Sequence, residues 1–159
     1  VRAWETLPDS LRAQAEGRSA VHVEGPESFA HRGRKGTEGG DLVQARRDKV
    51  YSFTRPIAWV HPRTGRTLLN VSQQMTSHIE GLPAEESEAL LEQLFDHMYA
   101  PDNVWQHDWQ QGDLVVWDNY ALQHARPDVR TDDNPRTLRK IGWPLPTVSQ
   151  QVDSSERID

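Results

Sequence analysis

The sequence predicts a mostly β fold with helices inserted between the strands. Three observations predict it: short segments of alternating apolar and polar residues, a hairpin signal at residues 55–72, and a long helix with an apolar stripe at 81–100. The chain has 159 residues, enough for one domain with a modest core. Hydrophobic residues make up 35% of it and the mean hydropathy is −0.79, so we expect exposed segments beside that core.

The first third of the chain predicts a helix, a strand and a long loop. Residues 8–16 read as a helix with Pro8 at its start, and Gly17 ends it. Residues 19–25 alternate like a short strand. Residues 31–49 hold four glycines and many charges without an apolar period, which predicts a mobile loop. That loop is either a solvated linker or a lid that closes over a site.

The middle of the chain carries the clearest signals. A Pro-Arg-Thr-Gly turn joins the two strands of the hairpin at 55–72. The helix at 81–100 has Pro83 near its start and acidic residues in its first turn, which complement the helix dipole. We expect its apolar stripe to pack in the core, and the stripe consists of Leu90, Leu91, Leu94, Phe95 and Met98.

Three further strands are expected at 103–109, 113–118 and 136–143, and residues 145–159 read as a loose tail. Residues 1–144 are therefore expected to belong to a single domain. The sequence opens directly into a helical pattern without an initiator Met, and we expect the N-terminal part of that domain to lie upstream of Val1.

Charge and composition argue against several classes of protein. The net charge of −6 without a long basic stripe disfavours nucleic acid as a partner. Cysteine is absent, which removes disulfides and thiolate metal sites. No apolar run approaches the ~18 residues that a membrane span needs. We expect a cytoplasmic protein without a membrane partner.

Most of the histidines carry no functional signal in the sequence. His31, His61, His97 and His107 are expected to be solvated or structural. His78 is placed in a loop before the long helix, where it either lines a pocket or has no role.

His124 differs because of its surroundings. It follows the pair Asp118-Asn119, which ends the predicted strand at 113–118. Side chains alternate along a strand, so Arg136 and Lys140 share one face of the last predicted strand. An arginine inside a small barrel needs an anion, and its planar fork suits a carboxylate. The stretch therefore offers either an imidazole for a metal beside a carboxylate clamp, or a surface histidine and a rim arginine.

Residues 4–144 resemble the C-terminal part of the taurine dioxygenase and 2,4-dichlorophenoxyacetate dioxygenase family. The motifs that carry the resemblance are "HPRTGR" at 61–66, "GDLVVWDN" at 112–119, and His124 followed by "RTLRK". The resemblance implies a double-stranded β-helix, or jelly roll, incomplete at its N-terminus. It implies an iron(II) and 2-oxoglutarate dependent dioxygenase acting with O2 on a small, anionic organic substrate.

The resemblance also implies roles for three residues. His124 matches the distal histidine of a two-histidine, one-carboxylate metal site. Arg136 matches the arginine that binds 2-oxoglutarate, and Lys140 falls where some members bind an anionic substrate group. Asp118-Asn119 would then aim His124 inward. No catalytic residue beyond the metal ligand is expected, and a homo-oligomer remains open.

One departure from the family pattern concerns the other two metal ligands. They form a His-x-Asp or His-x-Glu motif upstream of the distal histidine, and this chain has no His-x-Asp. A His-x-Glu occurs at His22-Val23-Glu24, at a position that resembles the region after that motif. We expect the chain to be the C-terminal portion of the enzyme and inactive by itself. The alternatives are a His22-Glu24-His124 site, or a non-catalytic anion-binding or scaffold module.

Overall fold

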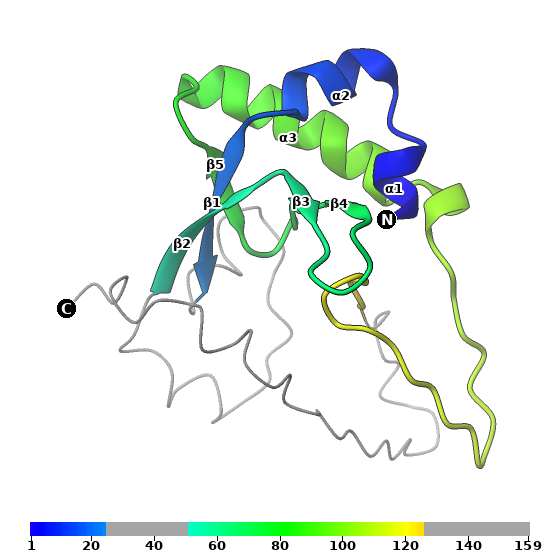
Figure 1. Cartoon of the computed structure of the whole chain (residues 1–159). Coiled ribbons are helices and arrows are strands. Elements are labelled where there is room, and N and C mark those ends of the chain that lie inside the picture. Colours follow the sequence, from blue (N-terminus) through cyan, green and yellow to red (C-terminus); the bar gives the residue numbers. More distant parts are fainter. Residues whose placement is uncertain (25–50, 126–159) are drawn as a thin grey trace, which may run out of the picture.

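The computed structural model describes residues 1–24 and 51–125, and the elements below are those of this part of the chain (Figure 1). None of its helices is long and apolar enough to cross a membrane. The predicted loop at 31–49, the predicted strand at 136–143, the tail and the residues His31, Arg136 and Lys140 lie outside the described residues. In chain order the elements are α1 (Arg2–Glu5), α2 (Asp9–Ala15), β1 (Ser19–Glu24), β2 (Tyr51–Pro56), β3 (Ala58–Val60), β4 (Thr67–Leu69), β5 (Thr76–Ile79), α3 (Ala84–Met98) and the 3-10 turn η3 (Pro101–Asn103).

The larger sheet has three antiparallel strands in the order β2-β1-β5. The predicted strand at 19–25 is confirmed as β1, which forms the centre of this sheet. Its register with β5 shifts between Val21 and His22, which marks a bulge. The expected loop around His78 is wrong, because that residue lies on β5 and its side chain is exposed.

The second sheet is the two-stranded hairpin of β3 and β4, and the predicted turn at its tip is confirmed. Gly65 has φ +68°, a left-handed conformation that other residues adopt at a cost. Its N–H donates to the His61 carbonyl over 2.9 Å, and the His61 N–H donates to the Arg66 carbonyl over 2.8 Å. These two bonds close the turn with the His61 side chain at its base.

The predicted helices at 8–16 and 81–100 are confirmed as α2 and α3. Figure 1 shows α3 lying alongside α2, with both helices on one side of the strands. The apolar stripe of α3 is buried as expected, because it faces β5 and the N-terminal helices. The core cluster consists of Trp4, Leu7, Ala15, Ala20, Ile57, Leu69, Val71, Ile79, Leu90, Leu91, Leu94, Phe95 and Met98.

The chain after η3 runs away from this core as an extended segment, and it returns toward the β3–β4 hairpin (Figure 1). The expected strands at 103–109 and 113–118 are wrong: the residues alternate, but the structure assigns them no strand. A ladder needs a neighbouring strand, and the expected neighbour at 136–143 lies outside the described residues.

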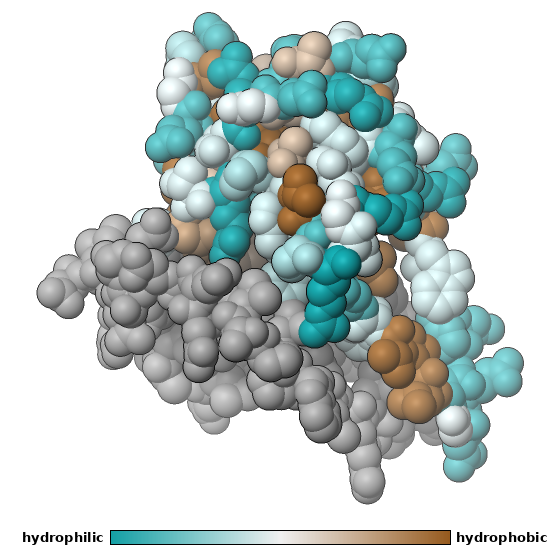
Figure 2. Space-filling view, viewed as in Figure 1, coloured by the Kyte–Doolittle hydropathy of each residue, from teal (hydrophilic) through white to brown (hydrophobic). Residues whose placement is uncertain are grey.

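Several apolar side chains of this extended segment are consequently exposed. Leu114 is 87% exposed and Val116 is 83% exposed. Figure 2 shows hydrophobic atoms at the lower right of the surface, where Figure 1 draws this segment. Within residues 1–24 and 51–125 the strands form two separate sheets rather than a closed barrel. The jelly roll therefore stays a prediction.

Candidate functional site

The candidate site is the turn at residues 118–124, which ends in His124. Figure 1 shows it close beneath the loop between β3 and β4. The N–H groups of Ala121 and Leu122 both donate to the Asp118 carbonyl over 3.1 Å, which closes the turn locally. The sequence placed Asp118 and His124 in one motif, and the structure gives that motif a turn conformation.

The His61 imidazole joins the hairpin to this turn. Its Nε2 atom lies 3.1 Å from Oδ2 of Asp118, and the histidine is 2% exposed. The backbone N–H groups of Arg63 and Thr64 both point at its Nδ1 atom, over 3.2 Å each. Two donors aimed at Nδ1 require that nitrogen to accept, so the ring proton sits on Nε2 and is donated to Asp118.

The Asp118 carboxylate is stabilised in its charged form. Its Oδ1 atom accepts the Tyr120 N–H over 2.9 Å, and this bond is the main reason that the pKa of Asp118 lies below its usual range. The nearby His61 lowers the pKa of Asp118 further, while partial desolvation acts in the opposite direction. The Tyr120 ring packs at 5.4 Å from the Trp59 ring and at 6.2 Å, edge-on, from His61.

Gln123 ties the far end of the turn to the body of the protein. Its Oε1 atom accepts the Tyr99 hydroxyl over 2.8 Å, at the end of α3. Its amide nitrogen donates to the carbonyl of Val71, a residue of the buried core. The residue directly before His124 therefore has both ends of its amide group engaged.

His124 itself is exposed, and its ring lies 5.2 Å from the Trp117 ring at an interplanar angle of 56°. An imidazole nitrogen is a suitable ligand for iron(II), so the residue fits one position of an iron site. No group of three His, Cys, Asp or Glu side chains that could hold a metal occurs within 1–24 and 51–125. The position of His124 relative to Arg136 stays a prediction, because Arg136 lies outside that part of the chain.

The alternative ligand His22 is buried in the sheet and 4% exposed. Burial, and next the charge of Arg55, lower the pKa of His22 to about 4. Its ring stacks on Phe53 at 5.2 Å, and Thr76 contacts its Nδ1 atom. These contacts are those of a neutral histidine packed in a core.

His97 and His107 have structural contacts. His97 Nε2 lies 2.9 Å from the Ala3 carbonyl, which connects α3 to α1. His107 Nε2 lies 2.9 Å from Oδ2 of Asp113 within the extended segment. These contacts agree with the expectation that both residues are structural.

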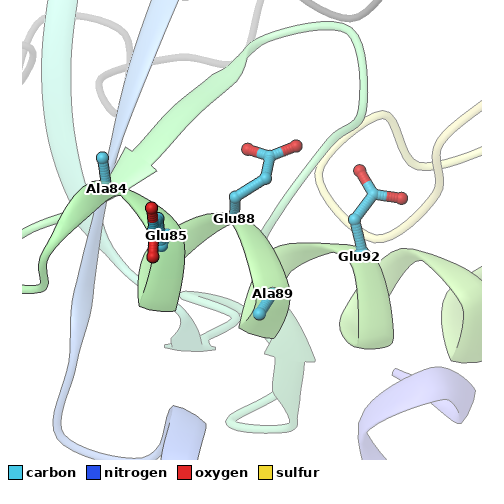
Figure 3. A pocket seen from close by; sticks show the side chains of 5 residues that line it. All are labelled: Ala84, Glu85, Glu88, Ala89 and Glu92. Atoms are coloured by element: carbon cyan, nitrogen blue, oxygen red, sulfur yellow. The ribbon is translucent and has the colours of Figure 1, made fainter.

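A shallow depression lies on α3, and no residue of the turn at 118–124 lines it (Figure 3). It is lined by Ala84, Glu85, Glu88, Ala89 and Glu92, all from the one helix. Because all five lining residues come from one helix, it has the form of an open surface rather than a binding cleft.

Sequence reasoning missed the residues that hold the turn, because they come from distant parts of the chain. His61 and Asp118 are separated by 57 positions, and Tyr99 and Gln123 by 24. The sequence did supply one signal, since His61 and Asp118 lie in "HPRTGR" and "GDLVVWDN", two of the motifs that carry the family resemblance. Nothing in the spacing of those motifs indicated that their histidine and aspartate form a pair.

Comparison with known proteins defines the class. The family "Taurine catabolism dioxygenase TauD, TfdA family" matches residues 1–141, and the chain belongs to this family. An alpha-ketoglutarate-dependent 2,4-dichlorophenoxyacetate dioxygenase of Cupriavidus pinatubonensis is 33% identical over 77% of this chain and 40% of its own length. A (S)-phenoxypropionate/alpha-ketoglutarate-dioxygenase of Sphingobium herbicidovorans is 34% identical over 77% of this chain and 42% of its own.

The comparison with solved structures also finds dioxygenases. The crystal structure of a taurine dioxygenase from Burkholderia xenovorans matches with a TM-score of 0.53 and 31% sequence identity. The match covers 70% of this chain and 32% of that chain. The chain thus spans less than half the length of the relatives it matches, and these relatives are named as 2-oxoglutarate-dependent or taurine dioxygenases.

Proposed function

We propose that the chain forms the distal-histidine part of an iron(II) and 2-oxoglutarate dependent dioxygenase with a jelly-roll fold. The observation that carries the proposal is the combination of family membership over residues 1–141 with a turn that is held at both ends and presents His124. Residues 1–144 would belong to one oxygenase domain, and residues 145–159 would form its tail.

The proposed roles follow the chemistry of each side chain. His124 would hold iron(II) through an imidazole nitrogen. Arg136 would bind a carboxylate of 2-oxoglutarate in its planar fork, and Lys140 would attract an anionic group of the substrate. Bound iron(II) and 2-oxoglutarate would supply the oxidative chemistry with O2, and the protein would supply orientation and charge.

The proposed substrate is a small organic anion. The relatives are named for 2,4-dichlorophenoxyacetate, phenoxypropionate and taurine, which all carry a carboxylate or a sulfonate. Lys140 is compatible with either group, because an ammonium is a point charge that does not require a planar partner.

The isolated chain is expected to lack turnover. An iron site of this class uses three protein ligands, and a lone imidazole holds a divalent metal weakly. Its exposed apolar side chains would also favour association, since Leu114 and Val116 lie on the surface. Cytoplasmic location, the absence of nucleic-acid and membrane partners, and a homo-oligomeric state stay predictions.

The experiment compares variants of the complete gene product, including any residues that precede Val1. We expect iron-dependent decarboxylation of 2-oxoglutarate, abolished in His124→Ala. His78→Ala is the matched control, because His78 is an exposed histidine on β5, and it should keep wild-type turnover. Turnover that persists in His124→Ala would refute the proposal. Binding of 2-oxoglutarate without any metal dependence would instead favour the non-catalytic anion-binding module.

A further inference from the structure

We propose that His61 and Tyr99 are positioning residues that fix the turn presenting His124, each through a hydrogen bond to one end of it. The inference rests on the proposed function, because it assigns these residues a purpose at the same site. Neither residue is proposed to contact metal or substrate.

The turn needs such contacts because of the way the chain reaches it. Residues 104–117 are extended and carry no ladder to the described strands. The backbone hydrogen bonds that the structure describes between this segment or the turn and other residues are local, namely Val104 to Pro101, Asp113 to Gln110 and the two bonds to the Asp118 carbonyl. Local bonds give the turn a shape but do not fix where it lies against the rest of the protein.

His61 fixes the first end. Backbone hydrogen bonds close the hairpin turn that carries it, since the His61 N–H donates to the Arg66 carbonyl and the Gly65 N–H donates to the His61 carbonyl. The side chain is 3% exposed, whereas that of Asp118 is 45% exposed, so a buried donor meets a carboxylate at the surface. The backbone N–H groups of Arg63 and Thr64 orient the ring and leave Nε2–H for Asp118.

Tyr99 fixes the second end. It directly follows α3, and its ring stacks on Phe95 at 6.2 Å. Its hydroxyl donates to Oε1 of Gln123 over 2.8 Å and accepts the Gln73 N–H over 3.2 Å. Because the Gln123 amide also donates to the Val71 carbonyl, the backbone just before His124 is tied to both the helix and the core.

His124 directly follows the residue that carries the second support. Its side chain is exposed, with the ring against Trp117. Among the described residues the ring contact of His124 is with Trp117, so the position of the imidazole depends on the backbone of the turn. Loss of either support would let the turn shift, and the imidazole would spend less time where a metal can use it.

The sharpest test uses two substitutions at His61 that distinguish the role of Nε2 from the role of Nδ1. Glutamine places an amide N–H near the position of Nε2 and can still donate to Asp118. Asparagine places its acceptor near Nδ1 and can still accept from Arg63 and Thr64. A positioning role through Asp118 predicts that His61→Gln preserves function and His61→Asn does not. A role confined to folding the hairpin predicts the reverse.

The measured quantity is the affinity of the complete gene product for Mn(II), which is a redox-stable probe for an iron site. We expect His61→Asn and Tyr99→Phe each to weaken Mn(II) binding by about 10-fold, at the low end for outer-shell partners of a metal ligand. His61→Gln should stay within about 2-fold of wild type. Tyr99→Phe keeps the aromatic stack on Phe95 and removes the hydroxyl alone, so it is unlike a folding mutation.

A second readout requires no metal. The Trp117 ring should shift the His124 ring protons in the NMR spectrum, and His61→Asn should move them toward their values in an unstructured peptide. Mn(II) affinity and His124 shifts that stay at wild type in His61→Asn and Tyr99→Phe would overturn the positioning role.

His124→Ala separates the two proposals. Loss of Mn(II) binding in His124→Ala, together with wild-type behaviour of His61→Asn and Tyr99→Phe, would keep the proposed function and reject this inference. Undiminished Mn(II) binding in His124→Ala would reject the proposed function itself.

Discussion

Oγ1 of Thr76 and Nδ1 of His22 lie 3.2 Å apart in the interior of the three-stranded sheet. The same hydroxyl oxygen accepts the Ser72 N–H over 2.8 Å, so Thr76 links the Ser72 backbone to the buried His22 ring. Nε2 of His22 is a buried atom without a hydrogen-bond partner in the described part of the chain. A charged imidazolium would place an N–H donor at this Nε2 position, where none of the described residues accepts it.

The first prediction concerns pH. Burial lowers the pKa of His22 from 6.5 to about 4, so between these values the unfolded chain binds more protons than the folded chain. The free energy of unfolding should therefore fall as the pH falls from about 6.5 to 4, by about 3 kcal/mol from this residue. Urea unfolding across that range measures the slope.

Two variants isolate the contribution of His22. His22→Phe should flatten the pH dependence, because it removes the proton uptake of the unfolded state. His78→Gln should leave the slope unchanged, since His78 is exposed in the folded chain. An equal slope in wild type and His22→Phe would show that the imidazole is already hydrated in the folded protein.

The second prediction concerns a buried hydrogen bond between α3 and β5. Oγ of Ser87 accepts the Ile79 N–H over 2.8 Å, and both residues are buried. Ser87→Ala should lower the free energy of unfolding by about 1–3 kcal/mol, because it leaves a buried N–H without an acceptor. Ser10→Ala, on the exposed side of α2, should change it by less than about 0.5 kcal/mol. Equal effects of the two variants in chemical denaturation would contradict this assignment.

The third prediction concerns the hairpin turn that carries His61. Gly65 has φ +68° and open space where a Cβ would lie, so a substitution there tests backbone strain without steric contact. Gly65→Ala should destabilise the fold by roughly 1–2 kcal/mol. Gly65→Asn should cost less, because asparagine tolerates the left-handed region better. Thermal unfolding of both variants makes the comparison, and an equal loss would argue against a strained turn.

The sequence predicted the elements whose signal is local. The stripe of α3 repeats with the period of a helix, and the hairpin turn needs a glycine at positive φ, so both were found where expected. It misjudged β5, where Thr76–Ile79 offers four residues and too short a pattern. It also assigned strands to 103–109 and 113–118, because alternation indicates a strand but cannot supply the neighbour with which it pairs.

The candidate site was predicted in part for the same reason. The sequence singled out His124 and the Asp118-Asn119 pair, which lie close together in the chain. It predicted no functional role for His61, because this residue is buried only where the β3–β4 hairpin packs against the turn at 118–124. A pair separated by 57 positions has no signature in local spacing.

The last prediction separates the two basic residues of the last expected strand, Arg136 and Lys140, in the complete gene product. Arg136→Ala should weaken 2-oxoglutarate binding by about 2–5 kcal/mol if the ion pair is buried. Arg136→Lys should restore only a small part of that loss, because an ammonium keeps the charge but lacks the planar fork. Lys140→Gln should raise the KM of an anionic substrate and leave that of 2-oxoglutarate near wild type. Calorimetric titration of 2-oxoglutarate, paired with substrate kinetics, distinguishes these outcomes. If Arg136→Ala leaves 2-oxoglutarate binding unchanged, Arg136 does not bind 2-oxoglutarate. If it also raises the KM of the substrate, Arg136 has the substrate-binding role proposed for Lys140.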